Sequence, residues 1–416
     1  MTRVLPDISP LRESREYRLL WSGQLVSQAG SALRLVAIPY QIYVLTGSSL
    51  AVGLIGLFSA IPLLSLSLFG GVIADRTDRR RLLLVTQLCL LFTSLGLALA
   101  TQLGVASVGL LYALTAIGAG FGALDAPARS SLAPTLVERR RIPAAAALNQ
   151  MNFRVSSIVG PALAGVLIAS FGLAAAYWLD AATFAVAIAA IAIMRTPRFV
   201  AEGERAHPLR SLIEGWSFLF SRPLLLATMA VDFFAMFFGV ARAVMPYYAD
   251  RVFHVGPEGL GLLYAAPGVG ATLVALTSGW MSTVERKGLG LLVSVAVFGL
   301  AMATFGLVPA SAFALACALL AIGEGADTVS TVFRWTILQL ETPDELRGRL
   351  SSINFLFVAG GPQLGQVESG LVADVFSPEV SVVTGGLACL AVAVAAGTLV
   401  PDLVRYRTAL TEASTT

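Results

Sequence analysis

Residues 70–81 read Gly70-Gly71-Val72-Ile73-Ala74-Asp75-Arg76-Thr77-Asp78-Arg79-Arg80-Arg81, a cluster of charge that interrupts an apolar sequence. Residues 50–74 before the charges and residues 82–101 after them contain no Asp, Glu, Lys or Arg. A helix needs about 20 apolar residues to cross the hydrocarbon of a bilayer. The stretch therefore predicts a short charged turn at a membrane surface, between two membrane-spanning helices.

The composition is that of a polytopic membrane protein. Of the 416 residues, 56% are hydrophobic and 13% are charged. The net charge of +3 is small and the basic residues are spread over the loops, which argues against nucleic-acid binding. Cys89, Cys317 and Cys389 lie inside apolar runs without paired spacing, so we expect packing residues and neither disulfides nor a metal site. No cofactor is expected.

Twelve apolar segments follow one another along the chain, and they predict an all-α membrane protein. The polar residues 1–18 precede a first segment that is too long for the core of a signal peptide, so we expect a membrane helix and not a cleaved leader. Six segments precede the polar stretch 195–222, and six follow it. The segments are 19–46, 49–74, 82–101, 105–128, 143–170, 173–194, 223–249, 258–281, 288–308, 311–337, 349–373 and 379–400.

An internal repeat relates the two sets of six segments. Gly118, Gly120 and Arg129 recur as Gly323, Gly325 and Arg334, and Gly160-Pro161 recurs as Gly361-Pro362. The repeat predicts two pseudo-symmetric six-helix bundles, 1–194 and 223–416, joined by a cytoplasmic linker, 195–222. Within the linker, apolar residues at helical spacing predict an amphipathic helix in the membrane interface, and a regulatory or partner-binding element is the alternative.

The basic residues predict the orientation. With the N-terminus inside, nearly all Lys and Arg residues fall in cytoplasmic segments, where short loops retain them. The exceptions are Arg251 in an outer loop and Arg34, Arg154 and Arg242 within helices. We therefore expect a multi-pass protein of the cytoplasmic membrane with both termini in the cytoplasm.

The charged turn resembles the loop signature of the major facilitator superfamily, Gly-x-x-x-Asp-Arg-x-Gly-Arg-Arg-Arg. The matching residues are Gly71, Asp75, Arg76, Arg79, Arg80 and Arg81, and Asp78 stands where the family has Gly. Asp tolerates the left-handed turn conformation better than most residues, so we expect the turn to be kept. From the position of Asp75 at the inner end of its helix we predict a conformational latch, in which Asp75 faces arginines and helix N-termini when the cytoplasmic side is closed and so stabilises the outward-open state.

A second motif lies in the segment 143–170. Gly160, Pro161 and Gly165 resemble the Gly-Pro-x-x-Gly-Gly motif of the antiporter branches, which export their substrates, although Ala164 replaces one Gly. The chain as a whole resembles the enterobactin (siderophore) exporter group and its drug-efflux relatives. The similar stretches are 36–41, 70–80, 207–212, 261–266 and 342–349. The arginine that drug exporters often carry before Gly118 is absent, because Leu114 and Thr115 precede that glycine.

Charged residues within the spanning segments are the candidate site residues. Each costs about 2.5–3.5 kcal/mol at a helix centre and must be offset by water or a partner. The candidates for the substrate and proton pathway are Arg34, Asp232, Arg242, Glu324 and Asp327. They lie on polar faces of three predicted helices: Asp232 shares a face with Gly239 and Arg242, and Glu324 shares one with Asp327. Arg34 shares a face with Ser27, Ser31 and Gln41. Such a polar stripe through an apolar helix implies a wetted path. For Arg154, Asp180 and Glu368 the alternative is a structural ion pair between helices. Arg129 and Arg334 lie at the cytoplasmic ends of their helices, where membrane topology alone explains a basic residue.

Each candidate has an expected role. Arg34 would offset an anionic group of the substrate, or an ionised carboxylate when the site is empty. Asp327 and Glu324, one helical turn apart, are the candidates for proton coupling, with Asp232 in reserve because it could pair with a helix-end arginine. The aromatic residues of 233–238 suit a ring-bearing ligand or lipid packing equally.

The sequence thus predicts a secondary transporter that exports a small organic molecule, siderophore-like or drug-like, by proton antiport and alternating access. A proton-coupled importer of a small metabolite on the same fold is the alternative. An enzyme is not expected, because His207 and His254 lie in loops and no phosphate-binding or metal-binding spacing is present. The expected partners are the small-molecule substrate, protons and the lipid bilayer, and the resemblance implies a monomer.

Overall fold

The structure, a computed structural model, describes residues 7–196 and 208–408, except for the side chains of 68–72, 74–76 and 208–213. All regular elements of the described residues are helical. The elements of the first half are α1 (Ser9–Glu13), α2 (Arg15–Thr46), α3 (Ser49–Arg76), α4 (Arg79–Gln102), α5 (Val108–Leu132), α6 (Ile142–Phe171) and α7 (Leu173–Ile193). The elements that follow are α8 (Pro208–Phe220), α9 (Pro223–Gly239), α10 (Met245–Tyr247), α11 (Gly256–Leu276), α12 (Lys287–Phe305), α13 (Phe313–Glu341), α14 (Arg347–Val375), α15 (Pro378–Leu399) and α16 (Pro401–Arg405).

The long helices match the predicted spans. Ten helical segments of the described residues are long and apolar enough to cross a membrane. The other two predicted spans correspond to α2 and α14, of 32 and 29 residues, whose apolar residues are interrupted by polar ones. Large apolar side chains such as Phe92, Leu276 and Leu399 are exposed, as expected where a helix faces lipid. The all-helical membrane fold is therefore confirmed.

The chain forms two compact units. Unit 1 comprises Met1–Gly47, Phe58–Arg205 and Val255–Ala265, and unit 2 comprises Ser48–Leu57, Ala206–His254 and Ala266–Thr416. Each unit consists mainly of one predicted set of six helices and includes the first part of one helix from the other set. We describe each unit by itself.

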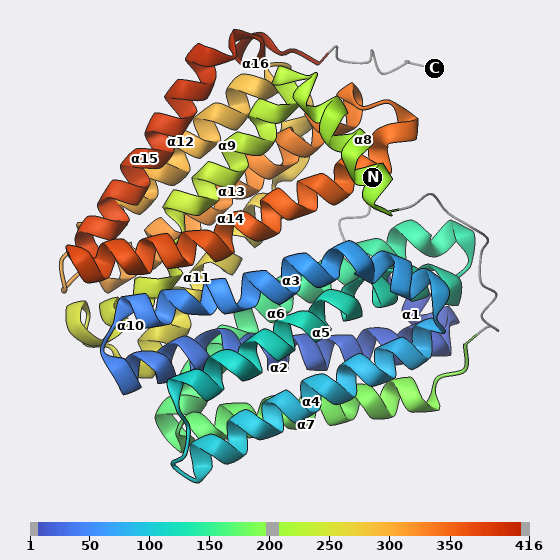
Figure 1. The fold of residues 1–416 in the computed structure, drawn as a ribbon, viewed down its shortest axis with the longest axis vertical. Helices are drawn as coiled ribbons and strands as arrows, with labels where there is room; N and C mark the ends of the chain where they lie inside the picture. Colours follow the sequence, from blue (N-terminus) through green and yellow to red (C-terminus); the bar gives the residue numbers. More distant parts are fainter. Residues whose placement is uncertain (1–6, 197–207, 409–416) are drawn as a thin grey trace. The chain divides into compact units, whose positions relative to one another are not determined.

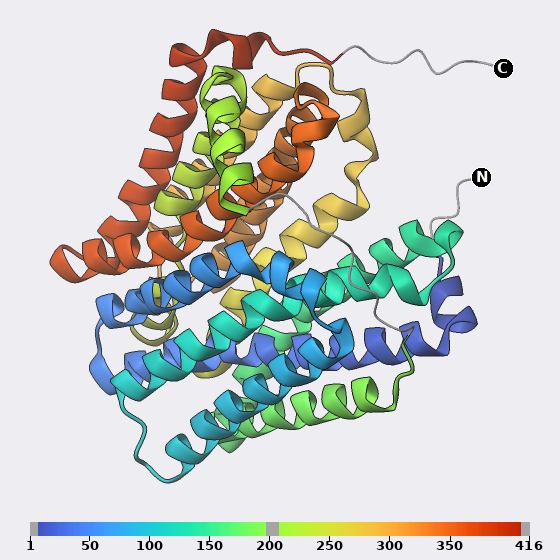
Figure 2. The same ribbon diagram turned by 45° about the vertical axis from the view of Figure 1, so that its right-hand side comes forward.

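Unit 1 is organised around α7, which packs against both α2 and α4. These three helices run side by side in Figures 1 and 2. Helix α6 packs on α2, and α5 packs on α4. An apolar cluster around Tyr17, Leu83 and Leu148 closes the end of the unit at which α2 begins. This packing brings the middle of α2 against the middle of α7.

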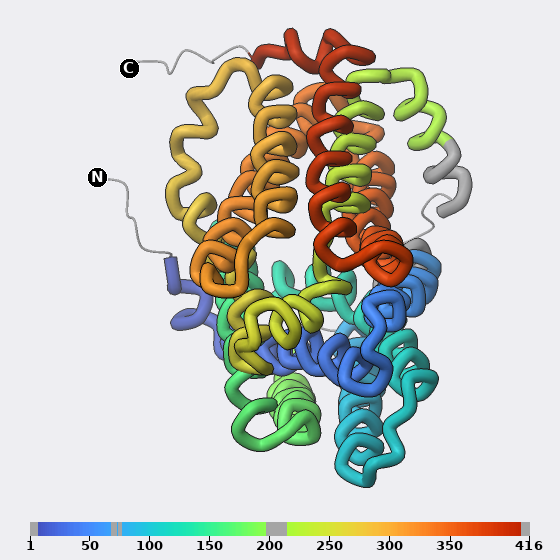
Figure 3. The backbone as a smooth tube through the Cα atoms, turned by 90° about the vertical axis from the view of Figure 1, so that its left-hand side faces the viewer, coloured from blue at the N-terminus to red at the C-terminus, as the bar shows by residue number. Residues whose placement is uncertain are grey.

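Unit 2 is built on two helix pairs, α12 with α13 and α9 with α14, and α15 packs on both α12 and α9. Figure 3 shows α15, in red, with α9, in yellow-green, alongside it. The linker helix α8 packs on α14, where Glu214 forms a 2.6 Å ion pair with Arg349. Leu219 of α8 is fully buried in the apolar core of the unit. The predicted linker helix thus has at least part of its apolar face covered by protein.

The charged turn ends in a helix cap that differs from the expectation for Asp78. This residue has φ −59° and ψ 113°, outside the left-handed region, and its carboxylate accepts a 3.0 Å hydrogen bond from the backbone N–H of Arg81. Asp is among the preferred N-cap residues because it satisfies an otherwise unpaired amide of the first turn. Asp78 is therefore tolerated as the N-cap of α4, and the predicted left-handed conformation is wrong.

The predicted helix 223–249 is not continuous. Helix α9 ends at Gly239, and after Val240 and Ala241 the chain continues as a 3₁₀ turn (Arg242–Val244), α10 and a π-helical turn (Tyr248–Val252). Gly239 has no room for a side chain, because a Cβ would lie 2.7 Å from Phe298 Cζ and 3.0 Å from Cys389 Sγ. Because α9 ends at Gly239, before Arg242, Asp232 and Arg242 do not share a face of one helix, and the prediction that they do is wrong.

Candidate functional site

Arg34 on α2 is paired with a carboxylate of its own unit. Its Nε lies 2.9 Å from Asp180 Oδ2 on α7, and the side chains of Arg34 and Asp180 are 15% and 0% exposed. Ser94 on α4 donates a 2.6 Å hydrogen bond to the same Asp180 oxygen. The guanidinium also lies over the Phe184 ring, 5.4 Å from its centroid. Of the two expectations for Asp180, the structure supports an ion pair between helices.

Small residues make room for this pair. A Cβ on Gly30, one turn before Arg34, would lie 2.9 Å from Asp180 Oδ1. Gly160 of the Gly-Pro motif packs on the same helix, where a Cβ would lie 3.0 Å from the Ala29 carbonyl oxygen and would overlap the Ala32 side chain. The motif therefore lets α6 approach α2 next to Arg34. Gly165, farther along α6, packs against Gly261 within unit 1, where its Cβ would lie 3.0 Å from that Cα.

The contact of Gly160 with α2 has a counterpart in unit 2, where Gly361 packs against α9. A Cβ on Gly361 would lie 3.0 Å from the Phe233 carbonyl oxygen and 3.3 Å from the Met236 Cβ. Position 233 follows 29 by 204 residues and position 236 follows 32 by 204, so the same two positions receive the glycine in both units. The Gly-Pro kinks thus serve the same close helix packing in each half.

A second buried ion pair lies within unit 2. Arg334 Nη2 on α13 is 3.1 Å from Asp232 Oδ1 on α9, and the two side chains are 4% and 5% exposed. Arg334 Nη1 donates a 2.7 Å hydrogen bond to Asn354 on α14. Asp232 is the reserve candidate for proton coupling because it could pair with a helix-end arginine, and it does pair with Arg334. Arg334 is more than a residue placed at a helix end by membrane topology.

The other pathway candidates are spread over unit 2. Glu324 and Asp327 are half-buried on α13, and Arg242 is exposed just beyond the end of α9. A cation at this point is favoured by the partial negative charge at the C-terminus of α9. Arg154 and Glu368 are half-buried, and within the described ranges neither forms an ion pair. Their predicted pairing is therefore not found.

Arginines of the charged turn form hydrogen bonds to the C-terminal ends of two other helices of unit 1. Arg79 donates a 3.2 Å hydrogen bond to the Ser131 carbonyl oxygen at the end of α5, and Arg80 donates a 3.0 Å bond to the Ile191 carbonyl oxygen at the end of α7. Cations at helix C-termini satisfy unpaired carbonyls and oppose the helix dipole. The side chains of Asp75 and Arg76 are not among those that the structure describes, so the latch itself stays a prediction.

Several polar partners were not predicted from the sequence. Ser94 and Asn354 hold the two ion pairs, and Tyr177 donates a 2.8 Å hydrogen bond to Gln41, whose amide donates to Thr101 at 2.9 Å. Gln41 is therefore buried inside unit 1, although the sequence placed it on a wetted stripe with Arg34. The only signal for these residues is an isolated polar side chain in an apolar segment, which does not name its partner.

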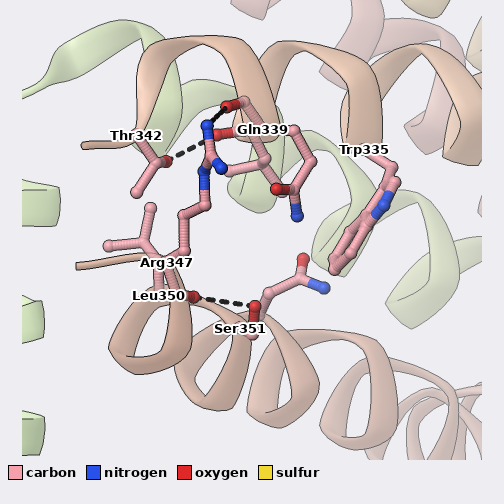
Figure 4. A pocket seen from close by; sticks show the side chains of 8 residues that line it. Trp335, Gln339, Thr342, Arg347, Leu350 and Ser351 are labelled. Atoms are coloured by element: carbon pink, nitrogen blue, oxygen red, sulfur yellow. Dashed lines mark hydrogen bonds between the residues drawn. The ribbon is translucent and has the colours of Figure 1, made fainter. Parts of the chain in front are cut away.

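A small pocket lies where α13 ends and α14 begins, lined by Trp335, Leu338, Gln339, Thr342, Arg347, Leu350, Ser351 and Asn354. Figure 4 shows Arg347 reaching across it to the Gln339 carbonyl oxygen, at 3.4 Å. Asn354 belongs both to this pocket and to the Arg334 ion pair. The pocket therefore reaches one end of the buried pair of unit 2.

Comparison with known proteins gives the family. The transmembrane secretion effector profile matches residues 6–413. Enterobactin exporter EntS from Citrobacter koseri is 30% identical over 404 residues, which cover 97% of this chain and 96% of that protein. Enterobactin exporter EntS from Shigella boydii is 29% identical over the same shares of the two chains.

Solved structures share the fold at low sequence identity. The nucleoside transporter NupG superposes with a TM-score of 0.79 at 10% identity, over 93% of this chain and all of that one. A D-xylose-proton symporter gives a TM-score of 0.72 at 16% identity, over 93% and 98%. The chain therefore belongs to the transmembrane secretion effector family, within the major facilitator superfamily of multi-pass membrane transporters.

Proposed function

We propose that this protein exports a small organic molecule, siderophore-like or drug-like, across the cytoplasmic membrane by proton antiport. The observation that carries the direction of transport is the similarity to enterobactin exporters over nearly the whole of both chains. The Gly160-Pro161 packing supports the same direction, because it places the antiporter-like motif of α6 against α2, the helix that carries the candidate substrate residue Arg34. We further propose that both termini are cytoplasmic and that the monomer is the working unit.

Proton coupling requires a carboxylate that gains and loses a proton during the cycle. Asp180 and Asp232 each have an arginine partner within their own unit, and both are almost fully buried. Glu324 and Asp327 are half-buried and lie one turn apart on α13, so they have readier access to water. We therefore assign coupling to Glu324 and Asp327, keep Arg242 as a further residue of the pathway, and assign Asp232 to the internal order of unit 2.

Alternating access requires contacts that hold one facing state and break in the other. The proposed latch consists of Gly71, Asp75, Arg76, Arg79 and Arg80. Arg79 and Arg80 support it by fixing the ends of α4, α5 and α7 relative to one another. Such a fixed platform would present Asp75 reproducibly to a partner that approaches and leaves.

A proton-coupled importer is the second candidate, because the same fold is found in a D-xylose-proton symporter. Uptake of labelled enterobactin by everted vesicles and by intact cells separates the two. An exporter accumulates the label in everted vesicles when the lumen is acidified, and this accumulation collapses when the pH gradient is dissipated. Accumulation by intact cells but not by everted vesicles would overturn export in favour of import.

A further inference from the structure

The two partners of the Arg34–Asp180 pair differ in accessibility. Asp180 is 0% exposed and its Oδ2 is shared by Arg34 and Ser94, whereas the Arg34 side chain keeps 15% of its surface. Among the described residues, Asp180 Oδ1 has no hydrogen-bond partner. The carboxylate is therefore fixed inside unit 1, and the guanidinium is the part of the pair that a ligand can reach.

The guanidinium of Arg34 has binding capacity beyond Asp180. It carries five N–H donors in a planar fork. Nε faces Asp180, and Nη2 lies 3.4 Å from Ser31 Oγ. Nη1 lies beside Gly118 on α5, where the missing side chain leaves room, since a Cβ there would be 3.5 Å away. The two Nη groups thus form the side of the fork on which a second oxyanion can bind.

Unit 2 lacks an equivalent of this pair. The offset of 204 residues that relates the glycine contacts places Phe238 at the position of Arg34. A Cβ on Gly385 of α15 would overlap the Phe238 backbone carbonyl, so small residues bring these helices together without any ion pair. Close packing at this position of the repeat therefore does not require a buried charge. Helix packing alone does not explain why unit 1 has the Arg34–Asp180 pair there.

We propose that Arg34 binds an anionic group of the substrate, a carboxylate or an ionised catechol, and that Asp180 is an internal counter-ion with which this group competes. The inference rests on the proposed transport function and names its substrate class as organic anions. An unpaired cation in the membrane interior is costly, so Asp180 keeps the empty site neutral. Because the same carboxylate opposes ligand binding, it lowers the affinity and eases release.

Whether a proton on Asp180 favours or opposes anion binding distinguishes a role in substrate recognition from a role in proton coupling. The groups that face Asp180 are Arg34 from α2 and Ser94 from α4, with Tyr177 one turn earlier on α7. A proton on Asp180 would remove the charge that competes for Arg34, so proton and anion would bind together, as in symport. Antiport requires them to bind alternately. Asp180 therefore serves recognition, and coupling stays with the carboxylates of α13.

The test uses the purified full-length protein in lipid nanodiscs and two matched probes, 2,3-dihydroxybenzoate and its neutral amide 2,3-dihydroxybenzamide. In calorimetric titrations, Asp180→Asn should tighten benzoate binding about tenfold, or about 1.4 kcal/mol, and leave the amide unchanged. Asp125→Asn is the matched control, because it removes another buried carboxylate of unit 1, the partner of Arg129, and should leave both affinities unchanged.

Unchanged or weaker benzoate binding in folded Asp180→Asn protein would overturn the inference, as would an equal gain for the amide. If that variant does not fold, the wild type and Arg34→Gln decide the question. The wild type must prefer benzoate over the amide, and Arg34→Gln must lose this preference. A protein that transports but shows no such preference refutes the anion site alone, whereas one that prefers the anion but does not transport refutes the proposed function alone.

Discussion

The Asp232–Arg334 pair offers a direct measurement of what a buried charge contributes to unit 2. Asp232→Asn leaves the Arg334 guanidinium in place, 4% exposed, with its hydrogen bond to Asn354. Breaking a buried pair by removing one partner costs about 3–5 kcal/mol, because the other charge is left uncompensated. At roughly 2–4 °C per kcal/mol for a unit of this size, 3 kcal/mol lowers the unfolding temperature by roughly 6–12 °C.

The measurement is thermal unfolding of purified protein in detergent, followed by intrinsic tryptophan fluorescence. The double variant Asp232→Asn with Arg334→Gln removes both charges, so it should lose less stability than the two single variants added together. Glu138→Gln is the control, because it breaks a pair with Arg140 in which the side chains are 65% and 70% exposed, and exposed pairs contribute little.

Two results would refute this reasoning. One is an Asp232→Asn protein that unfolds at the wild-type temperature. The other is a double variant whose loss equals the sum of the single losses, since independent effects mean that the two side chains do not interact. If the double variant is stable but does not transport, the pair has a role in transport beyond stability, and Asp232 is again a candidate for the proton pathway.

Three further predictions follow. Asp75→Asn should cut transport severalfold in vesicles while membrane insertion, measured by quantitative blotting, stays at the wild-type level; full transport would remove the latch from the mechanism. Asp327→Asn or Glu324→Gln should abolish accumulation driven by an imposed pH gradient but leave exchange without a gradient, and accumulation that survives in the double variant would place coupling elsewhere. Gly160→Ala should lower the yield of folded protein, because its Cβ overlaps an alanine of α2, whereas Gly109→Ala meets nothing within 4 Å and should have the wild-type yield in size-exclusion chromatography.

The spanning helices could be predicted from the sequence because their cause is local. A run of about 20 apolar residues must satisfy its own backbone hydrogen bonds in lipid, and a helix does so whatever its neighbours are. The charged turn at 70–81, the Gly-Pro motif and the repeat are likewise visible in the residue order. Even the repeated glycine contacts on α2 and α9 follow from positions that the sequence already relates.

The partners of the buried charges depend on tertiary structure. The sequence names no carboxylate as the partner of Arg34, and the structure pairs it with Asp180, because α2 packs on α7 and its rotation turns Arg34 into unit 1. Helix α9 ends at Gly239, which packs without room for a side chain against the Phe298 ring and Cys389, residues that are distant in sequence. Composition determines that a segment crosses the membrane, whereas the rotation of each helix, set by packing against its neighbours, decides which charge meets which.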